Sequence, residues 1–222
     1  AVPSGKTRDI PFEAAVSQSI TQTADSGQDP GTSPTFRARS IRWPVFAPGG
    51  DRLIFQAVGH LWQMEGPNGT PERITSGNRL EYAPAVSPDG RWVAFTTWSA
   101  DDGGALWKVQ LEPGEQNEPI RLTEIPDQYA SPAWSPEGER IAFVRGSGRA
   151  NRGKNLSTEL FLEIAWTDAE GDSTHVVTTT TNRGANRRMP RITWSSNGRR
   201  ILFHENENDS TYLTTITRGG LD

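Results

Sequence analysis

The polar and apolar positions of this chain repeat in four copies of one pattern. Each copy has a proline or β-branched residue, a short bridge, a turn and then an apolar segment. The copies are WPVFAPGGDRLIF (Trp43–Phe55), APAVSPDGRWVAF (Ala83–Phe95), SPAWSPEGERIAF (Ser131–Phe143) and RITWSSNGRRILF (Arg191–Phe203). Their turn positions Pro48, Pro88, Pro136 and Ser196 are 40, 48 and 60 residues apart, and their final phenylalanines keep these intervals. The register within each copy is therefore strict.

The turn of each copy separates two predicted strands. In the second copy Pro88 suits a type I turn, Asp89 can bond its own backbone and Gly90 supplies a positive φ. Residues 91–95 and 139–143 then begin polar and become almost continuously apolar. That pattern is typical of a strand buried on both faces.

Further strands complete each copy. Third strands are predicted at 60–64, 105–109, 160–164 and 212–216, and fourth strands at 72–75, 120–123 and 175–178. Four strands in a repeat of 40 to 60 residues indicate a blade of a β-propeller. We therefore expect an all-β chain with about four four-stranded antiparallel blades over residues 37–222, in repeats that start near 41, 82, 129 and 188. Residues 1–36 are expected to hold one strand, at 9–16, and a flexible connection rich in Ser, Thr, Gln, Gly and Asp.

Composition excludes several classes of protein. Only 33% of the residues are hydrophobic, but 8 Trp and 8 Phe argue against disorder, and no apolar stretch is long enough to span a membrane. A net charge of -4 argues against a dedicated nucleic-acid binder. The absence of cysteine excludes disulfides, thiolate metal sites and a cysteine nucleophile. Because the chain begins at Ala1 without a leader, we expect either a removed signal peptide or a fragment of a longer protein.

The repeats resemble those of TolB-like propellers, whose consensus is similar to PAWSPDGRxIAF followed by LW and RLT strands. The order of the connecting segments is similar to the N-terminal propeller of bacterial amidohydrolases. These segments are IPFEA (10–14), RARSIRWP (37–44), YAPAVSPDGRWVAFTTW (82–98), GGALWKV (103–109), YASPAWSPEGERIAFVRGS (129–147) and YLTTITRGGLD (212–222). The resemblance covers essentially the whole chain. It implies about six or seven blades in the intact propeller, so four blades would form an incomplete one.

The resemblance also implies a metal-dependent hydrolase barrel outside this chain. Such a barrel binds its metals through a His-x-His pair, whereas His60, His175 and His204 are far apart in this sequence and are interpreted as polar strand residues. Prolyl-oligopeptidase relatives carry a serine in a Gly-x-Ser-x-Gly elbow, which is absent here. We therefore expect no catalytic residue, metal ligand or cofactor in this chain, and a divalent metal bound in the parent hydrolase.

Candidate contact residues lie in three loops that the blade topology places on one face. The loops are 99–104, 146–158 and 181–189. Most tryptophans recur at equivalent repeat positions and are assigned to packing, whereas Trp98 and Trp166 break the pattern and are candidates for exposed contacts. The candidate binding residues are Trp98, Asp101, Asp102, Arg149, Arg152, Lys154, Arg183, Arg187 and Arg188. The basic side chains are either a docking surface for an acidic partner, hydrolase domain or anionic substrate, or ordinary solubilising charge.

Two functions follow from these features. The first is a non-catalytic propeller segment of a larger amidohydrolase-like enzyme, which docks against the hydrolase domain or shapes access of substrate to it. The alternative is a free-standing periplasmic interaction propeller of the TolB type. The expected partners are a hydrolase domain or another protein, or a second copy that covers open sheet faces, and not nucleic acid. The expected location is periplasmic or secreted, with the cytoplasm left open.

Overall fold

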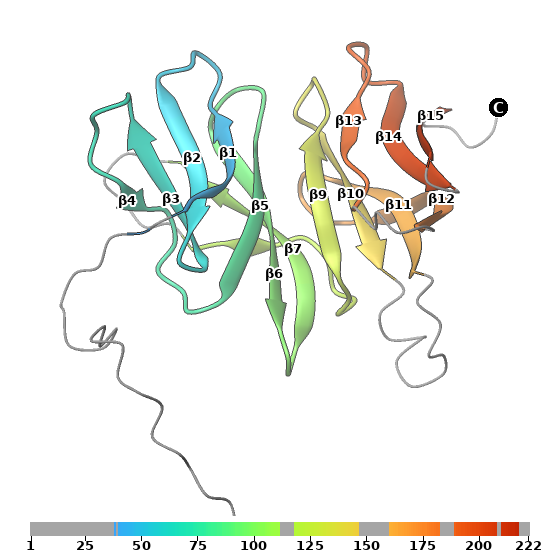
Figure 1. Ribbon diagram of the computed structural model, residues 1–222, viewed down its shortest axis with the longest axis horizontal. Coiled ribbons are helices and arrows are strands. Elements are labelled where there is room, and N and C mark those ends of the chain that lie inside the picture. Colours follow the sequence, from blue (N-terminus) through green and yellow to red (C-terminus); the bar gives the residue numbers. More distant parts are fainter. Residues whose placement is uncertain are drawn as a thin grey trace, which may run out of the picture. The chain divides into compact units, whose positions relative to one another are not determined.

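The computed structural model describes residues 38, 40–111, 118–146, 160–182, 189–207 and 210–217. The chain divides into two units, Ala1–Arg37 and Ala38–Asp222, and every described residue belongs to the second. The described residues form four separate antiparallel sheets joined by turns and loops, without a helix (Figure 1). In this part of the chain there is consequently no helix with the length and apolarity needed to cross a membrane.

Each sheet is built from strands that are consecutive in the sequence. The first sheet contains β1 (Arg42–Phe46), β2 (Arg52–Ala57), β3 (His60–Glu65) and β4 (Glu72–Arg73). The second contains β5 (Leu80–Val86), β6 (Trp92–Ser99), β7 (Gly103–Gln110) and β8 (Ile120–Arg121). The third contains β9 (Tyr129–Trp134), β10 (Arg140–Gly146), β11 (Leu160–Asp168) and β12 (Thr174–Asn182). The fourth contains β13 (Ile192–Trp194), β14 (Arg200–Glu207) and β15 (Ser210–Thr217).

This meander of short strands confirms the predicted propeller blades. The first strands of successive sheets contact one another, β1 with β5, β5 with β9 and β9 with β13, as the inner strands of neighbouring blades do. Two details differ from the prediction. The outer strands β4 and β8 are only two residues long, and the described part of the fourth sheet has three strands.

The core is divided into three clusters, one between each pair of neighbouring sheets. Ile54 and Leu61 of the first sheet pack with Phe95 of the second. The adjacent residue Ala94 points the other way and packs with Phe143 of the third sheet. In the same manner Val144 and Leu162 of the third sheet pack with Ile201 and Phe203 of the fourth. The second strand of a blade is thus buried on both faces, as its apolar pattern predicts.

The turn before that strand is held by the same bonds in different blades. In the second blade Gly90 has a φ of 73° and donates its N–H to the carbonyl oxygen of Ser87 at 2.9 Å, and the Asp89 carboxylate accepts the N–H of Arg91 at 3.1 Å. In the fourth blade Asn197 replaces the aspartate, and its amide oxygen accepts the N–H of Arg199 at 3.1 Å. The Asn-Gly sequence therefore preserves the turn although the proline is lost.

Two of the repeated tryptophans join neighbouring blades. The indole Nε1 of Trp134 donates to the carbonyl oxygen of Ala85 at 2.9 Å, and that of Trp194 donates to the carbonyl oxygen of Ala133 at 3.0 Å. Both carbonyl groups belong to the inner strand of the preceding blade. These bonds confirm that the recurrent tryptophan of the first strand has a packing role.

The described sheets do not close into a ring. The first and fourth sheets are linked through the second and third, so the structure is part of a propeller. Large apolar side chains are exposed at the inner strand of the first sheet: Trp43 is 44% and Phe46 is 63% exposed. An apolar inner strand that faces solvent is what an absent neighbouring blade would leave.

Candidate binding site on the loop face

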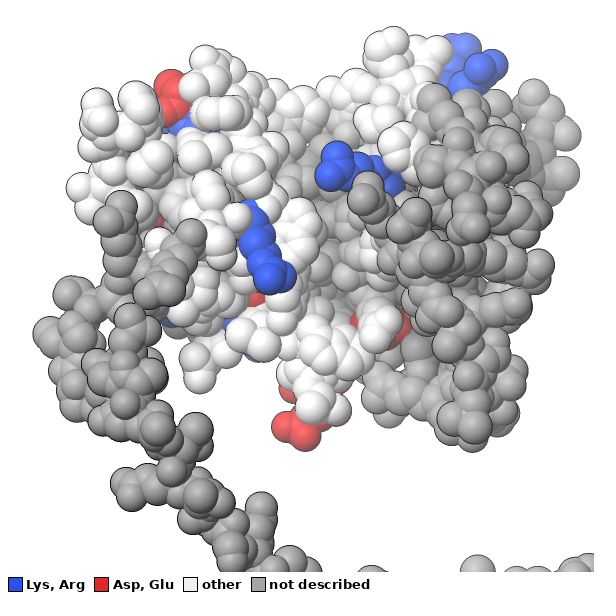
Figure 2. All heavy atoms as spheres, in the orientation of Figure 1, with Lys and Arg blue, Asp and Glu red and all other residues white. Residues whose placement is uncertain are grey.

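The β6–β7 hairpin carries three of the predicted contact residues. Trp98 lies near the end of β6 and is paired with Gly104 of β7. At the tip the Ser99 hydroxyl accepts the N–H of Asp102 at 2.9 Å, and Gly103 closes the turn with a φ of 72°. Asp101 and Asp102 are exposed, and acidic side chains mark this tip in Figure 2. The turn therefore holds two carboxylates beyond the edge of the sheet.

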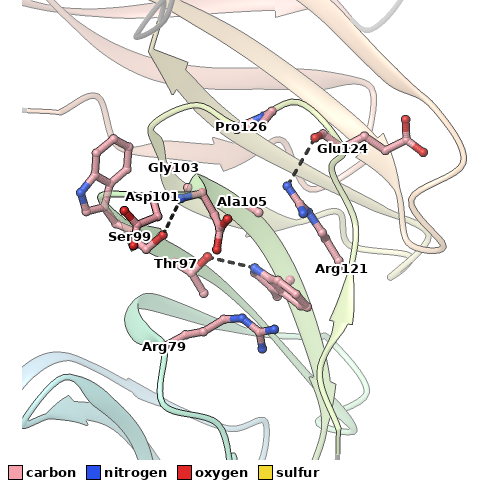
Figure 3. A pocket seen from close by; sticks show the side chains of 13 residues that line it. Arg79, Thr97, Ser99, Asp101, Gly103, Ala105, Arg121, Glu124 and Pro126 are labelled. Carbon is pink, nitrogen blue, oxygen red and sulfur yellow. Dashed lines mark hydrogen bonds between the residues drawn. The ribbon is translucent and has the colours of Figure 1, made fainter.

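These residues line a cavity of about 370 Å³ (Figure 3). Its wall combines the β6–β7 hairpin with the connections that precede and follow the second blade. Arg79 comes from the β4–β5 connection, and Glu124 comes from the β8–β9 connection. The hairpin and the two connections thus meet at one end of the second blade. The predicted common face of loops 99–104, 146–158 and 181–189 stays a prediction, because most of the last two loops lies outside the described residues. A volume of this size is near the lower end of the range of ligand sites.

The indole of Trp107 forms the floor that two arginines approach. Its Nε1 donates to the hydroxyl oxygen of Thr97 at 3.0 Å. The guanidinium carbon of Arg79 lies 4.6 Å from the centre of the indole, and that of Arg121 lies 5.9 Å from it. Both distances lie within the range of cation–π attraction. Two positive charges are therefore held at one aromatic ring.

Arg121 is anchored by backbone carbonyl groups. Its Nε donates to the carbonyl oxygen of Thr123 at 2.7 Å, and a terminal nitrogen donates to that of Glu124 at 3.3 Å. The equivalent residue of the first blade, Arg73, also donates to the backbone, at Gly77. The arginine of the RLT strand thus has a structural role in both blades, and in the second blade its side chain also lines the cavity.

Gly104 allows the close approach that forms the wall of the cavity. A Cβ at this position would lie 2.4 Å from the carbonyl oxygen of Asp127 and 2.6 Å from that of Thr97, with the Trp98 ring at 3.3 Å. The N–H of Gly104 donates to the carbonyl oxygen of Asp127 at 2.9 Å, which joins the hairpin to the β8–β9 connection. No side chain fits there without displacing the backbone.

Trp98 also lines a second cavity, of about 410 Å³, beside the inner strands. Trp43, Tyr82, Tyr129 and Met189 contribute to this cavity from successive blades. The rings of Trp43 and Tyr82 meet edge to face, with centroids 6.0 Å apart. Trp98 therefore stands between a cavity with charged walls and one with aromatic walls.

Backbone strain recurs at the inner strands that line this second cavity. Trp43, Ala83 and Ser131 have φ values of 46°, 49° and 51°, and each precedes a proline. Each lies where the pairing with the following strand shifts register. The bulge thus recurs in the first three copies, at the position just before their proline.

The remaining predicted contact residues lie outside the described residues. These are Arg149, Arg152, Lys154, Arg183, Arg187 and Arg188. Trp166 is described, and its ring stacks on that of His175 at 4.2 Å and packs against the third core cluster. Of the two tryptophans that break the repeat pattern, Trp98 lines cavities, whereas Trp166 packs on His175 and against the core between the third and fourth sheets.

Sequence reasoning did not single out Arg79, Trp107, Arg121 or Glu124. Trp107 and Arg121 occupy repeat positions, so their pattern indicated packing only. Arg79 and Glu124 lie in short connections between blades, whereas the predicted contact residues come from the long loops. The same topological rule, applied to every connection, would have placed both beside the β6–β7 hairpin.

Ligands for a metal are not grouped in the described part of the chain. It contains no set of three His, Cys, Asp or Glu side chains arranged to hold an ion. His60 lies beside Arg73, with 2.8 Å between the imidazole Nδ1 and an arginine nitrogen, His175 stacks on Trp166, and His204 is exposed on β14. These residues do not fit a metal centre.

The fold and the cavities describe an all-β protein made of propeller blades, with charged and aromatic cavities on its loop face. Comparison with solved structures identifies the fold as that of TolB-like propellers. The chain superimposes on a TolB protein from Agrobacterium tumefaciens with a TM-score of 0.60 and 19% identity, covering 82% of this chain and 60% of that one. For TolB from Acinetobacter baumannii the TM-score is 0.61 and the identity 21%, covering 81% and 41%. For a puromycin-hydrolyzing peptidase from Mycobacterium tuberculosis the TM-score is 0.55 and the identity 16%, covering 82% of this chain and 31% of that one.

Similarity in sequence is confined to part of the chain. No protein-family model matches it. An alignment over 119 positions, which covers 49% of this chain, is 31% identical to the uncharacterized peptidase YuxL of Bacillus subtilis and covers 18% of that protein. A stretch of 106 residues, 46% of the chain, is 28% identical to an uncharacterized protein of Agrobacterium fabrum and covers 35% of it. The match thus spans a minor part of either relative.

Proposed function

We propose that this chain is the propeller segment of a larger hydrolase, in which it is non-catalytic and docks against the hydrolase domain or shapes access of substrate to it. The supporting observation is the cavity on the loop face, where Arg79, Asp102 and Glu124 from three separate segments meet. Loops that a rigid scaffold brings together are common sites of contact. The apolar inner strand at Trp43 and Phe46 supports further blades beside the described ones.

The parent enzyme in this proposal is an amidohydrolase-like metal-dependent hydrolase that acts on C–N bonds. The support is the order of the connecting segments, from IPFEA (10–14) to YLTTITRGGLD (212–222). Its divalent metal would be bound by residues outside this chain. A periplasmic or secreted location belongs to the same proposal.

A peptidase is the second candidate for the parent, because one sequence relative carries that name and one structural neighbour is a peptidase. A free-standing periplasmic propeller of the TolB type is the third, supported by the likeness of fold. The natural reading frame distinguishes the three. Continuation past Asp222 into a His-x-His segment supports the amidohydrolase, and continuation into a Gly-x-Ser-x-Gly elbow supports the peptidase. A stop codon shortly after Asp222 supports the free-standing propeller.

The proposed role is tested by kinetics of the full-length protein. Trp98→Ala removes the wall shared by the two cavities, so we expect the KM for a large substrate to rise several-fold while kcat for a small chromogenic amide is unchanged. Ile120→Ala is the matched control, because Ile120 is 45% exposed and adjacent to Arg121 but does not line either cavity. Equal kinetics for Trp98→Ala and Ile120→Ala with every substrate would contradict a role in substrate access.

A test of docking uses the loop arginines. We expect Arg149→Ala, Arg152→Ala and Arg187→Ala together to weaken association of this chain with the separately expressed hydrolase domain, with a stronger effect at low salt. Unchanged association and unchanged activity of the full-length enzyme would leave these side chains as solubilising charge and contradict docking through them.

A further inference from the structure

The cavity beside Trp107 has an arrangement of charge that selects one kind of ligand. Its lining combines the exposed arginines Arg79 and Arg121 with the exposed carboxylates Asp101, Asp102 and Glu124. We propose that it binds a small zwitterion with the dimensions of a dipeptide, with the carboxylate of the ligand at Arg79 and Arg121 and its ammonium group at Asp101 and Asp102. This ligand site is the cavity on which the proposed function rests, but binding can be measured without a hydrolase domain.

The two arginines can bind a carboxylate because no described carboxylate pairs with them. Among the described residues the ion pairs of arginine and lysine are Arg52–Glu65, Lys108–Glu170 and Arg145–Glu163, so neither Arg79 nor Arg121 pairs with a carboxylate of that part of the chain. Arg121 uses two N–H groups on backbone carbonyl groups, and a guanidinium has about five. The remaining donors can bind a carboxylate, for which the planar guanidinium is suited.

The Trp107 indole also helps to position the two guanidinium groups. The Trp107 indole holds both guanidinium groups at cation–π distance, and its own N–H is already satisfied by Thr97. The Thr97 hydroxyl accepts that bond, so its hydrogen is free to donate to the ligand. A carboxylate at this point would meet donors from three elements, of which Arg121 is already held by its bonds to backbone carbonyl groups.

The carboxylates that line the cavity determine which anions it can bind. Asp101 and Asp102 stand at the tip of the β6–β7 hairpin and Glu124 in the facing connection, all exposed and all lining the cavity. Three carboxylates repel a polyanion such as a nucleic acid, and they attract the ammonium group of a ligand. The combination therefore favours a molecule that carries one charge of each sign.

The size of the cavity limits the ligand. A volume of about 370 Å³ accommodates one or two small residues and not a folded domain. The wall beside Gly104 is rigid, since the backbone there is paired with Asp127 and admits no Cβ. A short peptide product or substrate of hydrolysis at a C–N bond has both the charges and the dimensions required.

Calorimetric titration of the 222-residue chain tests the proposal with L-alanyl-L-alanine as the probe. We expect measurable binding of the dipeptide, with affinity lowered at least about tenfold for its C-terminal amide and for its N-acetyl derivative, because each has lost one charge-assisted contact. Binding of all three with equal affinity, or no binding of the dipeptide at about 10 mM, would overturn the proposal.

Variants assign the binding to this cavity. We expect Arg79→Gln to weaken binding of the dipeptide about tenfold and to remove the advantage of the free carboxylate over the amide. Asp101→Asn with Asp102→Asn should remove the advantage of the free ammonium group. Arg91→Gln is the matched control, because Arg91 is an exposed arginine in the turn before β6, outside the cavity lining. Equal loss in Arg79→Gln and Arg91→Gln would place the binding elsewhere and overturn the assignment.

The outcome is separable from that of the proposed function. Binding of the dipeptide by the 222-residue chain is independent of any catalytic domain. If the dipeptide does not bind but Trp98→Ala alters the substrate kinetics, the proposed ligand is wrong and the role in substrate access is supported. If the dipeptide binds but Trp98→Ala leaves the substrate kinetics unchanged, the proposed ligand is supported and the role in substrate access is contradicted.

Discussion

The ammonium group of Lys108 lies 3.0 Å from both carboxylate oxygens of Glu170 and joins the second blade to the third. The lysine side chain is 4% exposed, and its nitrogen is 4.6 Å from the centre of the Trp92 ring. The glutamate side chain is 73% exposed in the β11–β12 turn. A buried cation therefore depends on a partner that is largely in water.

This asymmetry predicts opposite results for the two partners. Glu170→Gln leaves a buried ammonium group without its carboxylate, and we expect a loss of about 1 to 2 kcal/mol, reduced from the cost of a fully buried pair by the exposure of Glu170. Lys108→Met fills the same space without charge and should be nearly neutral. Urea unfolding at pH 7 measures both. A larger loss for Lys108→Met than for Glu170→Gln would contradict this account of the pair.

The close approach at Gly104 can be tested by adding a Cβ at this position and measuring stability. Gly104→Ala forces a Cβ against the carbonyl oxygens of Thr97 and Asp127, and we expect a loss of about 1 to 3 kcal/mol from displacement of the hairpin. Gly77→Ala is the control, because only the far end of the Arg79 side chain lies within 4 Å of that Cβ. Thermal unfolding measures both variants. Equal stability of Gly104→Ala and the unaltered chain would contradict the close approach.

His60 predicts a dependence of stability on pH. Burial and the neighbouring Arg73 guanidinium lower the pKa of His60 below its ordinary value of 6.5, although Glu81 opposes them. The unfolded chain then binds more protons than the folded chain just below pH 6.5. The stability contributed by the neutral ring is complete above that pH and is lost as the pH falls through the folded pKa.

We therefore expect His60→Gln to flatten the pH dependence of the urea midpoint between about pH 5 and 7. Glutamine can still accept the bond from Arg73, so the loss at pH 8 should stay below about 1 kcal/mol. His204→Gln, at an exposed position on β14, is the control. An unchanged slope in His60→Gln would contradict the lowered pKa.

Asp168 predicts a second, more acidic transition. Burial of its carboxyl group acts to raise the pKa, but hydrogen bonds from the Asp172 N–H at 2.9 Å and the Ser173 hydroxyl at 3.0 Å outweigh it and lower the pKa below 3.8. The stability contributed by this carboxylate is complete above pH 3.8 and is lost as the pH falls through the folded pKa.

Asp168→Asn should therefore cost about 1 kcal/mol at neutral pH, by loosening the β11–β12 turn, and cost progressively less as the pH falls below 3.8. Glu72→Gln, at an exposed carboxylate on β4, controls for loss of charge alone. Acid titration followed by circular dichroism measures the difference. A cost that is constant down to about pH 2 would show that the carboxylate is not the stabilising form.

Local patterns in the sequence determined most of the fold. The turn residues around Gly90 and Gly198 specify where a strand begins, and the apolar residues that follow specify its burial on two faces. These signals act over a few residues, so they can be recognised without a structure. Repetition then indicated blades, and the recurrence of Trp134 and Trp194 indicated packing between them.

The candidate site depended on contacts that no local pattern contains. Arg79 and Trp107 are 28 positions apart in the sequence, and the guanidinium reaches the indole only because the β4–β5 connection lies beside β7. Trp98 could be recognised as an exception to the repeat, but not as the wall between two cavities. The sequence by itself determined the blades and the residues that depart from their pattern. Only the tertiary structure decided which departures share a cavity, because those contacts come from the stacking of neighbouring blades rather than from the period of a strand.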